Sequence, residues 1–152
     1  MSVAFRRESD EEHKEPRFEL PLPPGPNLVT ERGRALIDER IAALEAELPG
    51  ADELGREDIA RQLRYWKTRR ATAILAPPPP ADEIAFGSRV RFHLNGKEQE
   101  LTIVGDDQAD PAAGLIAFSA PLARAMIGAG EGERVAFNGR EDAIEIVEIG
   151  RV

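Results

Sequence analysis

The chain has 152 residues, a formal net charge of −8 and no cysteine. This length suits one domain, or a small domain with an appendage. The missing cysteines exclude disulfides and thiolate metal sites, and the acidic balance argues against a broad surface that grips nucleic acid. No apolar run approaches the roughly 18 residues of a membrane helix. The opening MSVAFRRESDEEHKE lacks the apolar centre of a secretory signal, so we expect a cytoplasmic protein with no membrane contact.

Two proline-rich stretches divide the chain. Residues 1–27 are charged and then proline-rich, a composition that predicts a disordered or loosely held tail. The run APPPP at residues 76–80 is stiff and extended, and it marks a boundary. We therefore expect a tail at 1–27, a helical hairpin at 28–76, a proline-rich linker at 77–85 and a second domain at 86–152.

The region between the proline runs has apolar residues at helical spacing. Thr30 is the expected N-cap of a first helix, with Glu31 at the positive end of the helix dipole. A heptad seam follows, and Pro49-Gly50 ends the helix. The same spacing recurs in a second helix, which Ala73 or Ile74 continues with Arg70 as an interruption. The seam residues are Ile37, Ile41, Leu44 and Leu48, then Ile59, Leu63 and Trp66. Two such helices with a short connection predict an antiparallel hairpin.

The second half of the chain alternates with the period of strands. Val90, Phe92 and Leu94 share one face, and Asn95-Gly96 predicts a tight hairpin turn. Pro121 suits the first turn of a short helix that ends at Gly128. The strand that returns from this Asn-Gly turn carries Leu101 and Ile103, and further strands are expected at 114–119, 134–137 and 143–149, the last two joined by the turn sequence NGRED. The fold class is therefore α+β, an antiparallel sheet crossed by one helix.

Few residues offer chemistry of their own. The only histidines are His13, in the tail, and His93, which alternates outward on a strand, so neither suggests a triad or a metal site. The loop GDDQADPAAG lacks the glycine spacing of a phosphate-binding loop. Its Asp and Pro residues form turns, so the loop can also be interpreted as a solvated connection between strands.

The expected hairpin tip is acidic, and its carboxylates admit two interpretations. Clustered carboxylates can hold Mg²⁺ together with waters or substrate phosphates. Alternatively, an acidic side chain caps the second helix, where negative charge favours the helix dipole. The residues concerned are Asp52, Glu53, Glu57 and Asp58.

The second helix is strongly basic. Such a run can meet an acidic partner or a nucleic-acid backbone, or it can be a solvated face paired with Glu39, Glu45 and Glu47 of the first helix. The basic residues are Arg61, Arg64, Lys67, Arg69 and Arg70.

Several of these stretches together resemble one known family. The segment LVTERGRALIDERIAALEAEL resembles the opening helix of the Gre transcript cleavage factors, which are elongation factors of bacterial RNA polymerase. The segments AFGSRVRF, TIVGDDQADPAAGLIAFSAPLARAMIG, EGERV and IEIVEI resemble the C-terminal domain of that family. The run Ser-x-Pro-Leu-Ala-Arg-Ala-x-x-Gly is the most specific piece.

The resemblance implies a fold, a partner and a set of site residues. The family's C-terminal domain is FKBP-like and binds the rim helices of the polymerase β′ subunit at the mouth of the secondary channel. The coiled coil reaches down the channel, with indirect contact to nascent RNA, and its tip helps to hold the second catalytic Mg²⁺ of the polymerase. A non-enzymatic monomer without a cofactor of its own is expected. By resemblance, the docking residues are Gly105, Asp106, Asp107, Ser119, Pro121, Leu122 and Arg124.

The sequence departs from the family at the tip. The family carries a Gly-Asp-x-x-Glu-Asn-Ala type of motif, whereas this chain reads GADELGREDIA, and both arms are shorter. Each missing helical turn shortens an arm by about 5.4 Å. The alternative is therefore a short-coiled-coil relative resembling the regulator of nucleoside diphosphate kinase, which binds polymerase or another protein without stimulating cleavage. A prolyl isomerase is a third hypothesis, disfavoured because the domain has only four aromatic residues, Phe86, Phe92, Phe118 and Phe137.

Overall fold

The computed structural model describes residues 19–151, so most of the predicted tail and His13 lie outside the described residues. The chain divides into two compact units, which are described separately. One unit holds the described residues up to Gly25 together with residues 37–72, and the other holds residues 26–36 and those from Ala73 onward. The first unit is helical, and the second contains every strand found among residues 19–151.

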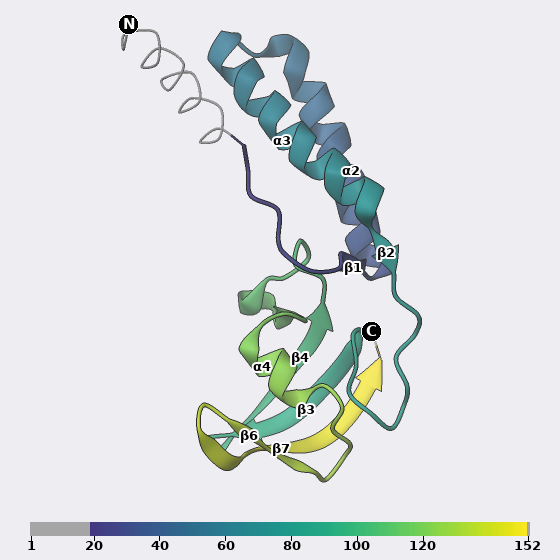
Figure 1. The fold of residues 1–152 in the computed structure, drawn as a ribbon, viewed down its shortest axis with the longest axis vertical. Coiled ribbons are helices and arrows are strands. Elements are labelled where there is room, and N and C mark those ends of the chain that lie inside the picture. The colour runs from purple at the N-terminus through teal and green to yellow at the C-terminus, as the bar shows by residue number, and fades with distance from the viewer. Residues whose placement is uncertain (1–18, 152) are drawn as a thin grey trace, which may run out of the picture. The chain divides into compact units, whose positions relative to one another are not determined.

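The helical unit is a hairpin, as predicted. Helix α2 spans Glu31–Glu47, a 3-10 turn follows at Leu48–Gly50, and helix α3 spans Glu53–Thr72 (Figure 1). Contacts between long side chains join the two helices: Lys67 Nζ lies 3.4 Å from Glu45 Oε2, and the Arg40 guanidinium lies 5.8 Å from the centre of the Trp66 ring. The predicted seam is buried at Ile37, Ile41, Leu44, Ile59 and Leu63. The heptad spacing therefore identified the contact faces of both helices.

The end of the α3 seam differs from the expectation. Arg69, only 3% exposed, is the buried residue, whereas Arg70 is exposed. Trp66 is followed at three and four positions by two arginines, and either spacing is allowed in a helix seam. Ile74 does not continue the seam, because it lies in strand β2 and is 52% exposed.

Two very short strands flank the hairpin in sequence. Strand β1, Leu28–Val29, pairs in parallel with strand β2, Ile74–Leu75. The amide of Ile74 donates to the carbonyl of Asn27 at 2.8 Å, and the amide of Ala76 donates to that of Val29 at 3.1 Å. This pairing was not predicted. It brings together the residues just before α2 and just after α3.

A five-stranded sheet forms the body of the second unit. Its strands are β3 Ser88–Leu94, β4 Lys97–Val104, β5 Leu115–Ala117, β6 Arg134–Phe137 and β7 Arg140–Arg151, in the order β5-β4-β3-β7-β6. All neighbours are antiparallel except β4 and β5, which are parallel. Both Asn-Gly turns are present, with positive φ at each of their residues. β7 begins three residues earlier than predicted because the turn before it needs only Asn138 and Gly139.

The core lies on one face of this sheet, beneath the short helix α4, Pro121–Met126. Ile144, Ile146 and Ile149 of β7 all point into the core, although they are two and then three residues apart. A register shift opposite Arg91 and Phe92 accounts for the extra residue, as in a β-bulge. Ile84, which lies in the predicted linker, is fully buried in the same core.

Candidate functional site

A tight turn follows strand β4 and begins the candidate docking surface. The amide of Gln108 donates to the carbonyl of Gly105 at 3.2 Å, so the two aspartates occupy the corner of a four-residue turn. Asp106 Oδ1 accepts a 2.6 Å hydrogen bond from the hydroxyl of Ser119. The structure therefore brings together two predicted site residues that lie 13 positions apart.

The two ends of this turn are buried against residues just before and at the start of α2, which belong to the same unit. A Cβ atom on Gly105 would lie 2.4 Å from the carbonyl oxygen of Leu28, so only glycine allows this approach. Gln108, 9% exposed, accepts a 2.6 Å hydrogen bond from the Thr30 hydroxyl. That hydroxyl in turn accepts the amide of Gly33 at 2.9 Å, which confirms Thr30 as the N-cap of α2. Gly105 is thus packed under the surface rather than presented on it.

Sequence reasoning missed Gln108. The only available signal was a single amide side chain at the end of an otherwise acidic turn, and that signal does not reveal a partner 78 residues away. Gly33 completes the arrangement, because a Cβ at that position would lie 3.0 Å from Gln108 Oε1. The first six residues of the segment LVTERGRALIDERIAALEAEL, which resembles the family's opening helix, therefore contain the residues that meet this turn.

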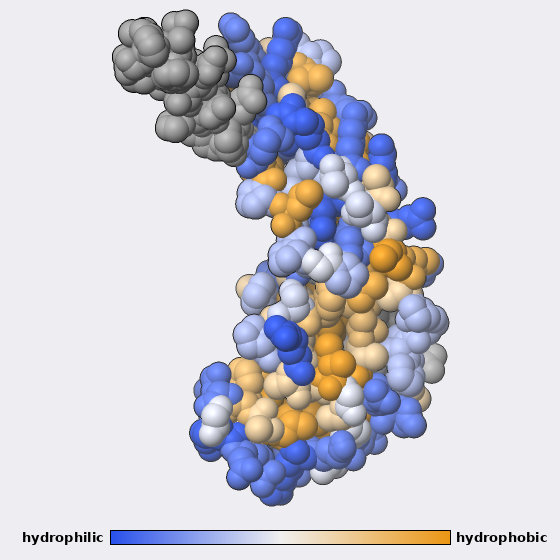
Figure 2. Space-filling view, in the orientation of Figure 1, coloured by the Kyte–Doolittle hydropathy of each residue, from blue (hydrophilic) through white to orange (hydrophobic). Residues whose placement is uncertain are grey.

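Helix α4 carries the rest of the predicted docking residues. Pro121 and Arg124 are exposed, whereas Leu122 is half-buried and packs against the core. Figure 2 shows hydrophobic residues gathered around hydrophilic ones over α4, and Ile127, just after the helix, is 41% exposed. A mixed apolar and charged surface of this kind is usual at protein–protein contacts.

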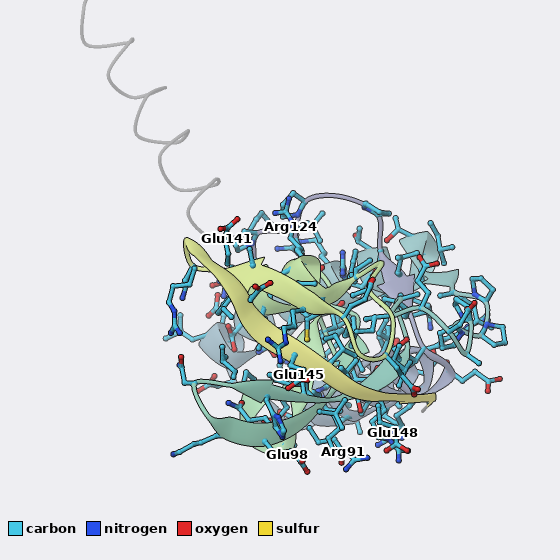
Figure 3. The ribbon with its side chains drawn as sticks, turned by 90° about the horizontal axis from the view of Figure 1, so that it is seen from below. Arg91, Glu98, Arg124, Glu141, Glu145 and Glu148 are labelled. Atoms are coloured by element: carbon cyan, nitrogen blue, oxygen red, sulfur yellow. The ribbon has the colours of Figure 1, made fainter. Side chains whose placement is uncertain are left out.

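The opposite face of the sheet carries paired charges. Arg91 lies between Glu98 and Glu148 in Figure 3, with N–O distances of 3.7 and 2.6 Å, while Arg124 lies on the other side of the domain. The hydrogen bond to Glu148 raises the pKa of Arg91. His93 lies on this outer face, with its ring nitrogens 3.2 Å from Glu98 and 3.5 Å from Glu145. The exposed ion pairs of Arg91 indicate a solvated face.

The tip carboxylates do not form one cluster. Asp52 Oδ1 accepts the amide of Gly55 at 2.8 Å and so caps α3. Asp58 pairs with Arg61 at 2.8 Å and accepts from Gln62 at 2.9 Å. Glu53 and Glu57 are exposed. Within residues 19–151, no group of three or more acidic or histidine side chains is arranged to hold a metal ion.

The tip also presents an apolar residue that sequence reasoning passed over. Leu54, in the first turn of α3, is 77% exposed, more than the other large exposed apolar side chains of the described residues. Its position outside the Ile59-Leu63-Trp66 seam was the signal that could have identified it. An exposed leucine directly after the exposed Glu53 gives the tip both apolar and acidic character.

The basic residues of α3 are partly paired within the hairpin unit. Arg64 donates to both carboxylate oxygens of Glu19, at 3.0 and 2.6 Å. This hydrogen bonding lowers the pKa of Glu19 and raises the pKa of Arg64. Lys67 pairs with Glu45, one of the predicted partners. The predicted pairing with the first helix is therefore confirmed for Lys67, whereas Arg64 pairs with Glu19, which was not among the predicted partners.

A groove of about 440 Å³ lies in the second unit, between the proline run and the start of α2. Its walls are Thr30, Glu31, Leu75, Ala76, Pro77–Pro79, Phe86 and Gly87. Phe86 is the single aromatic residue among them, and Phe92 is instead fully buried in the core. The groove thus lacks the aromatic lining that a prolyl isomerase hypothesis requires.

No helix among the described residues is long and apolar enough to cross a membrane.

Comparisons with known proteins agree with this architecture. A family model described as "Transcription elongation factor, GreA/GreB, C-term" matches residues 79–151. The chain is 36% identical to transcription elongation factor GreB of Neisseria meningitidis over 99 residues, which are 60% of each chain. It is 34% identical to transcription elongation factor GreA of Helicobacter pylori over 134 residues, which are 82% of this chain and 78% of the relative.

Solved structures of similar proteins were also found. GreA factor homolog 1 of Thermus thermophilus matches 83% of this chain and 99% of its own, at 14% identity and a TM-score of 0.40. The elongation factor GreA/GreB of Nitrosomonas europaea matches 81% and 98% of the two chains, at 20% identity and a TM-score of 0.37.

A helical hairpin, followed by a mostly antiparallel five-stranded sheet with one short helix, defines a two-part chain of the Gre type. The chain belongs to the GreA/GreB family of transcription elongation factors. That family is one of elongation factors rather than of enzymes. The chain spans 60% of the length of the Neisseria relative and 54% of that of GreA from Rhizobium etli.

Proposed function

We propose that this chain binds bacterial RNA polymerase in the cytoplasm and modulates elongation, docking on the rim helices of the β′ subunit beside the secondary channel. The docking surface consists of Asp106, Asp107, Ser119, Pro121, Leu122 and Arg124, with Gly105 beneath it. The observation that carries the proposal is the hydrogen bond between Asp106 and Ser119, which joins the turn after β4 to the start of α4.

The chemistry of this surface suits a helical partner with charged side chains. Arg124 offers an exposed cation, the half-buried Asp106 and Asp107 offer anions, and Pro121 and Leu122 add apolar surface. Specific protein contacts combine apolar and charged groups, and the charges favour one orientation of the partner.

A binding experiment tests this proposal. Core RNA polymerase is captured with the wild-type chain and with a Pro121→Glu, Asp107→Arg double variant. A Gln99→Glu, Lys97→Glu double variant is the control, because both residues are exposed on the β3–β4 hairpin. We expect the docking variant to bind at least tenfold more weakly and the control to bind like the wild type. A wild-type chain that does not capture polymerase would exclude the proposal.

The tip supports a second candidate, in which the chain binds polymerase without supplying carboxylates to its Mg²⁺. Asp52 is engaged as a helix cap and Asp58 as an ion pair, which leaves Glu53 and Glu57 as the exposed carboxylates. Transcript cleavage by a stalled polymerase decides between the two. Cleavage stimulated by the wild type and lost in a Glu53→Gln, Glu57→Gln variant would favour metal delivery. No stimulation by a chain that binds polymerase would favour the second candidate.

A further inference from the structure

The turn Gly105–Gln108 contacts two different parts of its unit. Its corner residue Asp106 holds Ser119 of the proposed docking surface, whereas its end residues Gly105 and Gln108 lie against Leu28 and Thr30 at the start of the hairpin. The Gln108–Gly105 hydrogen bond closes the turn, so only four residues separate the two contacts.

The Thr30 hydroxyl makes two hydrogen bonds. It accepts the Gly33 amide and donates to Gln108 Oε1, so the same oxygen caps α2 and ties that cap to the turn. Gln108 is buried, and a hydrogen bond at a buried site is costly to leave unmade. Gly33 and Gly105 permit the close approach on the two sides of this link, since a side chain at either would crowd it.

We infer that Gln108 is a positioning residue, which couples the proposed docking surface to the first turn of α2 within the same unit. This inference rests on the proposed function for its effect on transcription. It assigns Gln108 no contact with the partner, because the side chain is buried and its oxygen is occupied by Thr30.

The first test separates binding from effect. Gln108→Ala removes the link but leaves the Thr30–Gly33 cap, and Gln108→Met keeps the side-chain volume without the acceptor. We expect both variants to bind core polymerase with a Kd within about threefold of the wild-type value. At a saturating concentration of each variant, its effect on elongation should be at least tenfold smaller than that of the wild type. Thr30→Ser, which keeps the hydroxyl, should behave like the wild type, as should the exposed control Gln99→Ala.

A second measurement does not depend on polymerase. The Arg34 amide donates to the Thr30 carbonyl in the first turn of α2, and the Arg124 amide donates to the Ala120 carbonyl in α4. In Gln108→Met, hydrogen exchange at the amides of Gly33 and Arg34 should accelerate about tenfold, with Arg124 unchanged. In Ser119→Ala, the same two α2 amides should accelerate by a smaller factor if the turn couples the two sides.

The outcomes are distinct. If the wild type does not bind polymerase, the proposed function fails, and the exchange measurement alone decides the coupling. The inference is overturned if Gln108→Met leaves the exchange of Gly33 and Arg34 unchanged. It is also overturned if the variant loses binding in proportion to effect, because Gln108 would then belong to the docking surface itself.

Discussion

The carbonyl oxygen of Leu28 approaches Gly105 so closely that a Cβ atom there would lie 2.4 Å from it. The neighbour is a backbone atom in a paired strand, so it cannot move aside as a flexible side chain would. Gly105→Ala should therefore lower the free energy of unfolding of the sheet unit by about 1–3 kcal/mol, the usual cost of overpacking. Urea unfolding measures the change.

The matched control is Gly50→Ala, because a Cβ at that position meets no atom within 4 Å. Its effect should stay within about 0.5 kcal/mol, as for surface substitutions generally. Equal effects of the two substitutions would contradict the close approach of Leu28 and Gly105.

The carboxylate of Asp52 has a structural role that can be separated from its charge. Asp52→Ala removes the cap on α3 and should destabilise the hairpin by about 1 kcal/mol. Asp52→Ser removes the charge but keeps an oxygen for the Gly55 amide, so it should retain most of the stability. Thermal unfolding followed by helical circular dichroism compares the three proteins. A serine variant as unstable as the alanine variant would contradict the capping role.

The pair between Glu19 and Arg64 makes the hairpin unit sensitive to acid. Hydrogen bonding to Arg64 holds the pKa of Glu19 below its ordinary value of 4.5. A lowered pKa in the folded state means that the pair stabilises the fold above about pH 4.5, and that this contribution is lost as the pH falls through the lowered value. Titration of the Glu19 carboxyl by NMR measures the shift directly.

Substituting Arg64 tests whether this residue causes the lowered pKa of Glu19. Arg64→Gln should return the pKa of Glu19 toward its ordinary value, whereas Lys67→Gln should not, because Lys67 pairs with Glu45 instead. An unshifted Glu19 in the wild type would show that this exposed pair does not persist in solution.

Arg124 is the exposed cation of the proposed docking surface. Arg124→Glu should weaken polymerase binding at least tenfold, and the loss should shrink at high salt because exposed charges are screened. Lys97→Glu makes the same charge reversal on the β3–β4 hairpin and should bind like the wild type. Fluorescence anisotropy at two salt concentrations measures polymerase binding by both variants and its dependence on salt. Equal losses in the two variants would indicate a general charge effect rather than a local contact.

Much of the fold could be predicted because its signals are local. The N-cap at Thr30, the heptad spacing of both helices and the two Asn-Gly turns each depend on neighbouring residues, and the structure confirms them. The direction in which strands pair is not a local property. Nothing in the alternation of β5 shows that it lies parallel to β4, and strands as short as β1 and β2 have no period at all.

The candidate site was predictable to a smaller extent. The resemblance selected residues on the turn and on α4, and the structure places Asp106 beside Ser119. It could not show that Gly105 is buried, because burial here depends on the distant Leu28. At the tip, the acidic residues of one short segment gave no indication of which would cap the helix and which would pair with an arginine. That choice depends on the direction of each side chain in the first turns of α3.

The pairing of β1 with β2 has a consequence for how this architecture can vary. The chain leaves this two-stranded ladder after Val29 and returns to it at Ile74. Residues 30–73 therefore form the connection between two paired strands. Removing or adding one turn on each helix would change the arm length by about 5.4 Å and leave every strand partner unchanged. The length of the two helices can therefore change, in natural variants or in engineered proteins, while the pairing of the strands stays the same.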